Sequence, residues 1–162
     1  MRVITQVFAS IVILCVLTQV PAQATRAEAF NLRGVNSTVN LNNYRGRVVY
    51  LDFWASWCTP CRKSFPWMNA MQKQYGKYGF DVVAVNLDQN RELANQFLEQ
   101  TPANFTVAFD PTGKTAESYS VEVMPSSFLI DRKGELVAIH KGFRKVDSAT
   151  LEKEIRQLLA RK

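Results

Sequence analysis

Two of the three cysteines in this 162-residue chain lie close enough together to react as a pair. Cys58 and Cys61 are separated by a Thr-Pro dipeptide, and Cys15 lies in an apolar N-terminal segment. Such a pair can be half of a zinc site, a small structural disulfide or a redox dithiol. A zinc site needs about four ligands, but the chain has no second cysteine pair and only one histidine, His140. A disulfide that closes so short a loop stabilises a fold little. We therefore predict a redox dithiol that cycles through a Cys58–Cys61 disulfide.

A carboxyl group precedes the dithiol within an apolar segment. Residues 48–53 read Val-Val-Tyr-Leu-Asp-Phe, a nearly continuous apolar run that predicts a central buried strand. Alternation along the strand places Asp52 inside the protein, where a carboxylate is costly unless it is paired or protonated. We expect its pKa to be raised. The alternative is an aspartate at a strand end that bonds to the backbone or to water.

The elements that must position the dithiol alternate between strand and helix. Hydrophobic patterning predicts strands at 30–32, 39–41, 48–53, 82–85, 105–109, 126–130 and 136–141. Helical spacing predicts helices at 60–75, 91–100, 114–119 and from Asp147 or Ser148 onwards. The first two strands and the last two strands are each expected to form a hairpin. This order indicates a layered α/β fold.

Residues 1–24 differ from the rest of the chain. Arg2 is the only charge before Arg26, and the apolar stretch 11–17 is followed by Pro21 and by Ala-Gln-Ala ending at Ala24. This pattern predicts a signal peptide over 1–24, cleaved after Ala24, and one domain over 25–162. A retained membrane anchor is the alternative, because residues 3–20 are nearly long enough to cross a bilayer. Both interpretations place the domain outside the cytoplasm, and we expect a periplasmic location.

The sequence around the dithiol resembles the thioredoxin superfamily. Residues 48–62, Val-Val-Tyr-Leu-Asp-Phe-Trp-Ala-Ser-Trp-Cys-Thr-Pro-Cys-Arg, are similar to the active-site strand and helix start of thioredoxins, and the match continues at 82–88, 124–131 and 134–137. The export signal, the N-terminal hairpin and the segment 91–119 make the chain most similar to the TlpA/ResA-like branch. The resemblance implies a thioredoxin fold, a central mixed β-sheet flanked by helices, with an N-terminal β-hairpin and a central helix–strand insertion.

The resemblance also implies a role for each residue of the dithiol region. Cys58, near the free N–H groups and the positive end of a helix, attacks the partner as a thiolate. Cys61 then resolves the mixed disulfide. Asp52 matches the buried aspartate that passes protons to and from the second cysteine. Thr59 and Pro60 form the active-site loop, and Pro60 suits the first turn of the helix.

Three residues are expected to contact the substrate. The resemblance implies a cis peptide bond between Met124 and Pro125, which presents the backbone of Met124 to an extended substrate. A proline in a turn or at a sheet edge is the alternative. Trp57 is expected on the surface that faces the partner, whereas Trp54 is expected to lie half in the core.

The chain departs from its branch at one position near the dithiol. TlpA/ResA-like proteins usually carry a glutamate three residues after the second cysteine, and this chain has Ser64 there. The lysine that thioredoxins place near the buried aspartate also has no counterpart, with Ala84 as the nearest match. A serine cannot store a proton near neutral pH, so we assign the acid–base role to Asp52.

The sequence therefore predicts an exported thiol–disulfide oxidoreductase that acts on protein disulfides or dithiols as a reductant. We expect it to use no metal or cofactor. Cytochrome c maturation and repair of wrong disulfides are the two expected settings, each with an upstream membrane or periplasmic electron donor. A net charge of +6, spread without a basic face, argues against nucleic-acid binding. The alternatives are a copper carrier that uses His140 and a peroxiredoxin-like peroxidase, which Trp57 beside Cys58 disfavours.

Overall fold

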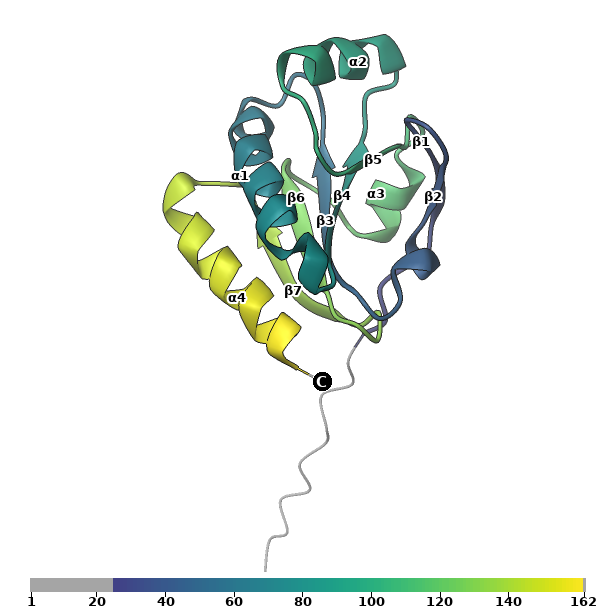
Figure 1. Ribbon diagram of the computed structural model, residues 1–162. Helices are drawn as coiled ribbons and strands as arrows, with labels where there is room; N and C mark the ends of the chain where they lie inside the picture. The colour runs from purple at the N-terminus through teal and green to yellow at the C-terminus, as the bar shows by residue number, and fades with distance from the viewer. Residues whose placement is uncertain (1–24, 162) are drawn as a thin grey trace, which may run out of the picture.

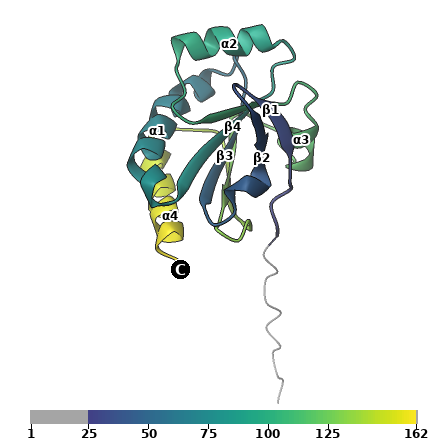
Figure 2. The ribbon, with the colours of Figure 1, turned by 45° about the vertical axis from the view of Figure 1, so that its right-hand side comes forward.

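The computed structural model describes residues 25–161, so the expected signal peptide at 1–24 lies outside the described residues. Seven strands of this part of the chain form one sheet in the order β2-β1-β5-β4-β3-β6-β7 (Figures 1 and 2). The strands are β1 (Asn31–Gly34), β2 (Thr38–Asn40), β3 (Val48–Trp54), β4 (Phe80–Asn86), β5 (Thr106–Phe109), β6 (Ser126–Ile130) and β7 (Leu136–Lys141). The helices are α1 (Thr59–Tyr75), α2 (Arg91–Gln100), α3 (Lys114–Ser118) and α4 (Ser148–Ala160), with 3-10 turns at Leu41–Tyr44, Gly76–Tyr78 and Lys145–Asp147.

The sheet is mixed, with β3 in its interior. β3 runs parallel to β4 and antiparallel to β6, and β4 runs parallel to β5. The β1–β2 hairpin extends the sheet beyond β5, and β7 forms the opposite edge. Helix α2 and strand β5 follow β4 and supply the expected helix–strand insertion. The predicted α/β architecture with an N-terminal β-hairpin is confirmed.

Helices α1 and α4 cover one face of the sheet, and α3 lies against the other (Figures 1 and 2). Alternation along β3 divides its side chains between two cores. Tyr50 and Trp54 pack with residues of α1 and α4, whereas Leu51 and Phe53 pack on the side of α3. Asp52 therefore faces α1 and α4, in a strand whose residues are all buried.

Element ends differ from the sequence expectation by one or two residues. Helix α1 begins at Thr59, one residue earlier than predicted, and continues through Pro66. Strand β4 begins at Phe80 because its first two residues pair with Val48 and Val49 of β3. Such local differences arise because strand limits depend on the partner strand, which the local sequence does not contain.

Candidate active site

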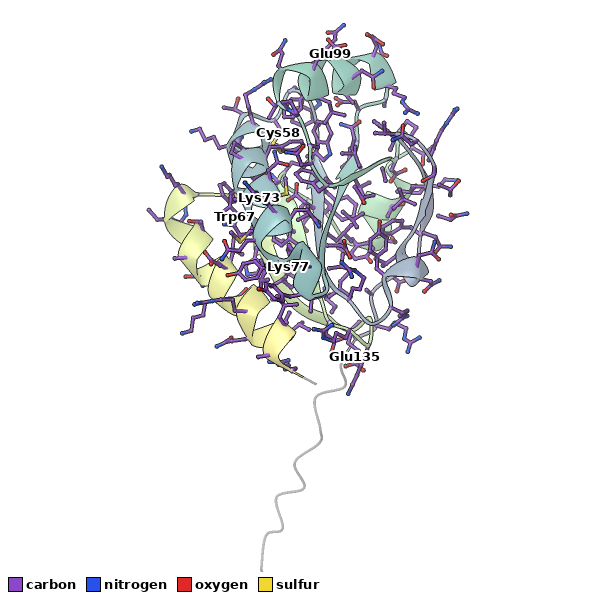
Figure 3. All side chains as sticks on the ribbon, in the orientation of Figure 1. Cys58, Trp67, Lys73, Lys77, Glu99 and Glu135 are labelled. Atoms are coloured by element: carbon purple, nitrogen blue, oxygen red, sulfur yellow. A yellow bond between two sulfur atoms is a disulfide. The ribbon has the colours of Figure 1, made fainter. Side chains whose placement is uncertain are left out.

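The dithiol lies where β3 ends and α1 begins (Figure 3). Cys58 is the N-cap residue of α1, and its Sγ accepts a hydrogen bond of 3.2 Å from the backbone N–H of Cys61. The two cysteines form a disulfide with their Cα atoms 5.3 Å apart. Cys61 is fully buried and Cys58 is 4% exposed. The pair is therefore asymmetric, and only Cys58 touches the surface.

The position of Cys58 favours a thiolate in the reduced state. The first turn of a helix has N–H groups without intrahelical partners, and the helix dipole adds positive potential there. A negative charge on Cys58 Sγ is stabilised by both effects, and the N–H of Cys61 already points at this sulfur. Cys61 lies one turn into the helix with no exposure, where the charged form is disfavoured. The arrangement can therefore support one attacking and one waiting thiol.

The loop before β6 lies at the same end of the sheet as the dithiol. The Met124–Pro125 peptide bond is cis, and Pro125 directly precedes β6. Because Ser126 pairs with Phe53 of β3, this loop lies beside the segment that connects β3 to Cys58. Met124 is partly buried against the core, whereas Val123 is 47% exposed. A partner can therefore approach backbone and apolar side chains at this edge.

The two tryptophans near the dithiol have opposite environments. Trp57 is 70% exposed beside Cys58, on the surface that a partner would contact. Trp54 is fully buried, so the expectation that it lies half in the core is wrong. Its ring packs against Phe65 of α1 and Phe97 of α2, at centroid distances of 4.9 and 4.7 Å. Helix α2 supplies the cover for Trp54, and the local sequence of β3 did not indicate it.

Asp52 is completely buried on the face of the sheet that α1 covers. Neither carboxylate oxygen has a hydrogen-bond partner within residues 25–161. Burial raises the pKa of Asp52 well above its ordinary value. Its neighbours across the sheet are Ala84 and Ser127, so Ala84 stands beside it as the sequence comparison indicated. Such a carboxyl group is protonated more readily than an exposed one and can hold a proton inside the protein.

Ser64 does not replace the glutamate of the branch. Its side chain is buried, and its hydroxyl donates a hydrogen bond of 2.9 Å to the carbonyl oxygen of Cys61. This is a local bond within one turn of α1, which satisfies the hydroxyl without creating an ionisable group. Asp52 is the carboxyl group that β3 places in this core.

One residue of the site was missed by the sequence analysis. The carboxylate of Asp88 accepts hydrogen bonds from the backbone N–H and the hydroxyl of Ser56, both at 2.9 Å. It also accepts one of 2.7 Å from the side-chain amide of Asn86. These bonds tie the loop before Cys58 to the end of β4. The signal in the sequence was an aspartate three residues after the predicted strand 82–85, close to the polar residue Asn86. Its partner Ser56 is 32 residues away, so local patterns could not pair the two.

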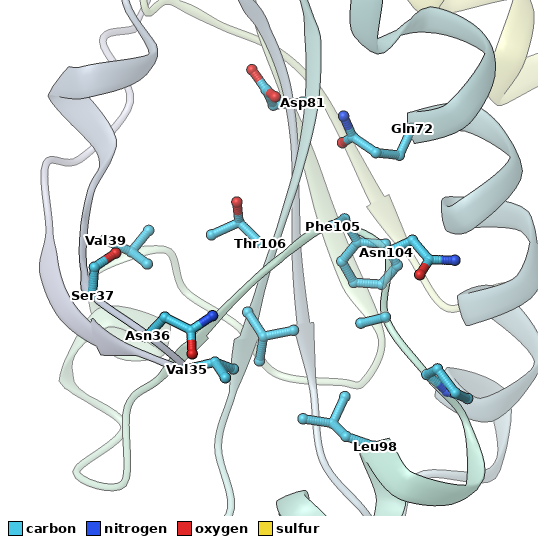
Figure 4. Close-up of a pocket in the computed structure, with 14 residues that line it drawn as sticks. Val35, Asn36, Ser37, Val39, Gln72, Asp81, Leu98, Asn104, Phe105 and Thr106 are labelled. Atoms are coloured by element: carbon cyan, nitrogen blue, oxygen red, sulfur yellow. The ribbon is translucent and has the colours of Figure 1, made fainter.

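A cavity of about 640 Å³ lies away from the dithiol, between the β1–β2 hairpin and the segment before β5 (Figure 4). Asn36, Gln72 and Asn104 contribute polar groups to its wall. Its lining contains neither the cysteines nor Asp52. The cavity is therefore separate from the dithiol.

Within residues 25–161, no group of three or more Cys, His, Asp and Glu side chains could hold a metal ion. His140 instead lies 2.9 Å from Glu154, between Nε2 and Oε2. No helix between residues 25 and 161 is long and apolar enough to cross a membrane.

Comparisons with known proteins agree with this arrangement. The family model described as Redoxin matches residues 21–155. The thiol-disulfide oxidoreductase ResA of Bacillus thuringiensis subsp. konkukian is 35% identical over 104 residues, which are 64% of this chain and 60% of that protein. ResA of Bacillus subtilis is 31% identical over 122 residues, 75% of this chain and 68% of that protein.

A solved structure gives the same fold. The crystal structure of a putative thiol:disulfide interchange protein DsbE from Chlorobium tepidum is 54% identical, with a TM-score of 0.84. The likeness covers 85% of this chain and 97% of that one. With the family match, it confirms the predicted thioredoxin fold. The chain spans less than two thirds of the length of the first ResA relative, at 60%.

Proposed function

We propose that this chain, which belongs to the redoxin family and is a TlpA/ResA-like protein of the thioredoxin superfamily, is a thiol–disulfide oxidoreductase that acts on proteins. The observation that carries the proposal is the disulfide between an N-cap cysteine and a fully buried cysteine one turn later. The similarity to thiol-disulfide oxidoreductases named ResA and to a putative thiol:disulfide interchange protein DsbE supports the same reaction.

The reaction proceeds in two exchanges. The thiolate of Cys58 attacks a disulfide of the partner, one partner sulfur leaves as a thiolate, and a mixed disulfide forms. Cys61 then loses its proton and attacks Cys58 Sγ, which releases the second partner sulfur. The partner disulfide is reduced to two thiols, and the Cys58–Cys61 dithiol is oxidised to the disulfide by the same two electrons.

Asp52 exchanges the proton of the buried thiol. Its carboxylate accepts the proton of Cys61 when the mixed disulfide is resolved, and its carboxylic acid returns a proton when the Cys58–Cys61 disulfide is reduced. Its complete burial and its raised pKa support this role. Ser64 cannot share it, because its hydroxyl is bonded to the carbonyl of Cys61.

The partner docks over Trp57 and the cis-proline loop. Exposed Trp57 offers apolar area, and the backbone of Met124 beside Pro125 pairs with an extended segment of the substrate. Thr59 and Pro60 complete the loop that the partner sulfur must approach. Because this mode of binding uses hydrogen bonds to the partner's backbone, it is compatible with different partner sequences.

The physiological direction is reduction of partners outside the cytoplasm. The signal peptide expected over 1–24 and the Thr-Pro dipeptide between the cysteines support a periplasmic reductant that receives electrons from a membrane or periplasmic donor. Preparation of thiols for haem attachment in cytochrome c maturation and repair of wrong disulfides are the two settings that fit this chemistry.

Trapping of the mixed disulfide tests the proposal. In the full-length protein, Cys61→Ala should leave Cys58 able to attack and unable to be released, so disulfide-linked partners should accumulate on it. Non-reducing electrophoresis with mass spectrometry measures them. The matched control is Cys58→Ala, which keeps Cys61 and Cys15 and should trap nothing. Equal capture by the two variants, or none by Cys61→Ala while the unmodified protein reduces test disulfides, would contradict the assignment.

A further inference from the structure

A row of polar side chains runs across the sheet from Asp52 to its edge. Asp52 of β3 pairs with Ser127 of β6, and Ser127 pairs with His140 of β7. Residues directly opposite one another in neighbouring strands point to the same face. The row therefore lies on the face covered by α1 and α4, with adjacent strands spaced about 4.8 Å apart. It leads from the most buried carboxyl group of the site to the edge strand.

The other end of the row, beyond Asp52, is apolar. On the opposite side of the row, Asp52 is followed by Ala84 of β4 and Val107 of β5. The residues that α1 buries include Cys61 and Phe65, and none of them carries a charge. Among the residues that pair with Asp52 in this row, only Ser127 has a side chain that can accept and donate a proton. The sheet register thus leaves one direction along the row for proton transfer from Asp52, towards β6 and β7.

Tyr50 joins the row to α4. Its hydroxyl is buried on the same face of β3, and its pKa is raised by burial, then by the charge of Asp52, and to a smaller extent by the charge of Glu154. The side chain of Ser127 acts on the same hydroxyl in the opposite sense. The hydroxyl of Tyr50 therefore lies close enough to Asp52, Ser127 and Glu154 to interact with all three.

His140 and Glu154 stand at the outer end of the row. Nε2 of His140 lies 2.9 Å from Oε2 of Glu154, and the two side chains are 24% and 33% exposed. Nδ1 of His140 is buried and has no hydrogen-bond partner within residues 25–161, and Oε2 of Glu154 is buried without hydrogen-bond geometry. Each side chain thus has a buried polar atom and an exposed part. An imidazole ring can accept a proton at one nitrogen and donate one from the other, which suits a relay between the interior and solvent.

We propose that Ser127, His140 and Glu154 form a proton path that connects Asp52 to solvent. The inference rests on the proposed function, because the path serves Asp52 during disulfide exchange. Neither His140 nor Glu154 touches a reacting sulfur, and both act through Asp52.

The proton balance of the path is simple. When Cys61 is to be deprotonated, Asp52 first gives its proton through the hydroxyl groups to the His140–Glu154 pair and hence to water, and the resulting carboxylate takes the proton of Cys61. When the disulfide is reduced, Asp52 gives a proton to the departing Cys61 sulfur and is reprotonated along the same path. No electron moves along the row.

Asp147 and Arg144 are charged residues that lie just before the start of α4, at the outer end of the row. Arg144 chiefly, and His140 to a smaller extent, lower the pKa of Asp147 at the start of α4. Lys141, the neighbour of His140 on β7, is bonded to Glu122 at 2.7 Å on the other face of the strand. Ser127 is the residue of β6 that pairs with both Asp52 and His140. From α1, the ring of Trp67 packs against the ring of Tyr50, with the ring centroids 5.2 Å apart. These groups define the electrostatic setting in which the pair exchanges its proton.

The test measures single-turnover oxidation of the reduced full-length protein by a disulfide-bonded peptide, followed by tryptophan fluorescence across pH. His140→Gln and Glu154→Gln should each slow the resolution step by about tenfold at neutral pH, a smaller loss than the 10²–10⁴-fold expected for a direct acid–base group. Added imidazole should restore the His140→Gln rate, which it would not do for a structural defect. The matched controls are Lys141→Gln and Glu152→Gln, because Lys141 faces away and Glu152 is bonded to Tyr75.

Comparison with Asp52→Asn separates the two proposals. If Asp52→Asn is slow while His140→Gln, Glu154→Gln and Ser127→Ala all match their controls, the path is wrong and the role of Asp52 stands. If the His140→Gln rate falls without rescue by imidazole and without a changed pH profile, the residue is structural and the path is also wrong. If Asp52→Asn keeps the parent rate, both the path and the role of Asp52 fail. If the unmodified protein does not exchange disulfides, the proposed function fails.

Discussion

At the scale of single residues, the site depends on how burial treats each ionisable group. Cys58 touches the surface and has free N–H groups nearby, whereas Cys61 and Asp52 are fully buried. Burial disfavours a charge on both, so each is a poor anion by itself. A thiol and a carboxyl group that both resist ionisation can share one proton at low cost, which fits their alternating roles.

Asp52 should make stability depend on pH. Burial raises its folded pKa above the unfolded value of about 3.9. Between these two values the folded state binds more protons, so the free energy of unfolding should fall as pH rises through that window. Denaturant unfolding of the oxidised protein at several pH values should show this fall, and Asp52→Asn should remove it. A parent and a variant with the same pH dependence would mean that Asp52 ionises as easily when folded.

At the scale of elements, the dithiol is positioned by the ends of two parallel strands. β3 delivers the loop that carries Cys58, and the end of β4 holds that loop through the hydrogen bonds from Ser56 to Asp88. Parallel strands bring their carboxyl ends to the same edge of a sheet, so the loops after them can bond to each other. The N-terminus of α1 is therefore held in a fixed position relative to the sheet.

Asp88→Ala should loosen this loop. Loss of the acceptor leaves the buried amide of Asn86 and the half-buried groups of Ser56 without their partner, at a cost of about 1–3 kcal/mol of stability. We also expect slower disulfide exchange per folded molecule, because the N-cap geometry of Cys58 is no longer fixed.

Asp110→Ala is the matched control for Asp88→Ala. Asp110 is also buried and accepts the backbone N–H of Thr115 at 2.8 Å, but it serves α3. It should lose comparable stability with unchanged exchange. If the two variants exchange disulfides equally well, the loop does not need Asp88. Chemical denaturation and turnover with a test disulfide measure the two effects.

At the scale of the whole molecule, the sheet separates two hydrophobic cores that have different roles. The core under α1 and α4 contains both cysteines, whereas the core on the side of α3 contains no residue of the dithiol. The first core must both stabilise the fold and position the site. The second stabilises the fold from the opposite face.

Substitutions in the two cores should therefore have different effects. Phe128 packs against Phe53 and Tyr119 on the α3 side, and Phe65 packs against Trp54 and Phe97 beside the dithiol. Phe128→Ala and Phe65→Ala should each cost about 3–5 kcal/mol of stability. Only Phe65→Ala should also change the rate of exchange, measured at a temperature where both variants are folded. A rate change for Phe128→Ala alone would reverse this assignment of the two cores.

The sequence by itself determined the chemistry and the order of the elements. The spacing of Cys58 and Cys61 and the apolar run around Asp52 identified the dithiol region, because each signal lies within a few consecutive residues. The same local patterns predicted every strand and helix to within a few residues.

The tertiary structure decided which distant residues meet. Asp88 reaches Ser56 because β3 and β4 are parallel neighbours, and Asp52 aligns with Ser127 and His140 through the register of three strands. Shifting the register by one residue would turn those side chains to the opposite face. Register and helix packing are set by the whole core, so no local segment of the sequence could indicate the proton path from Asp52.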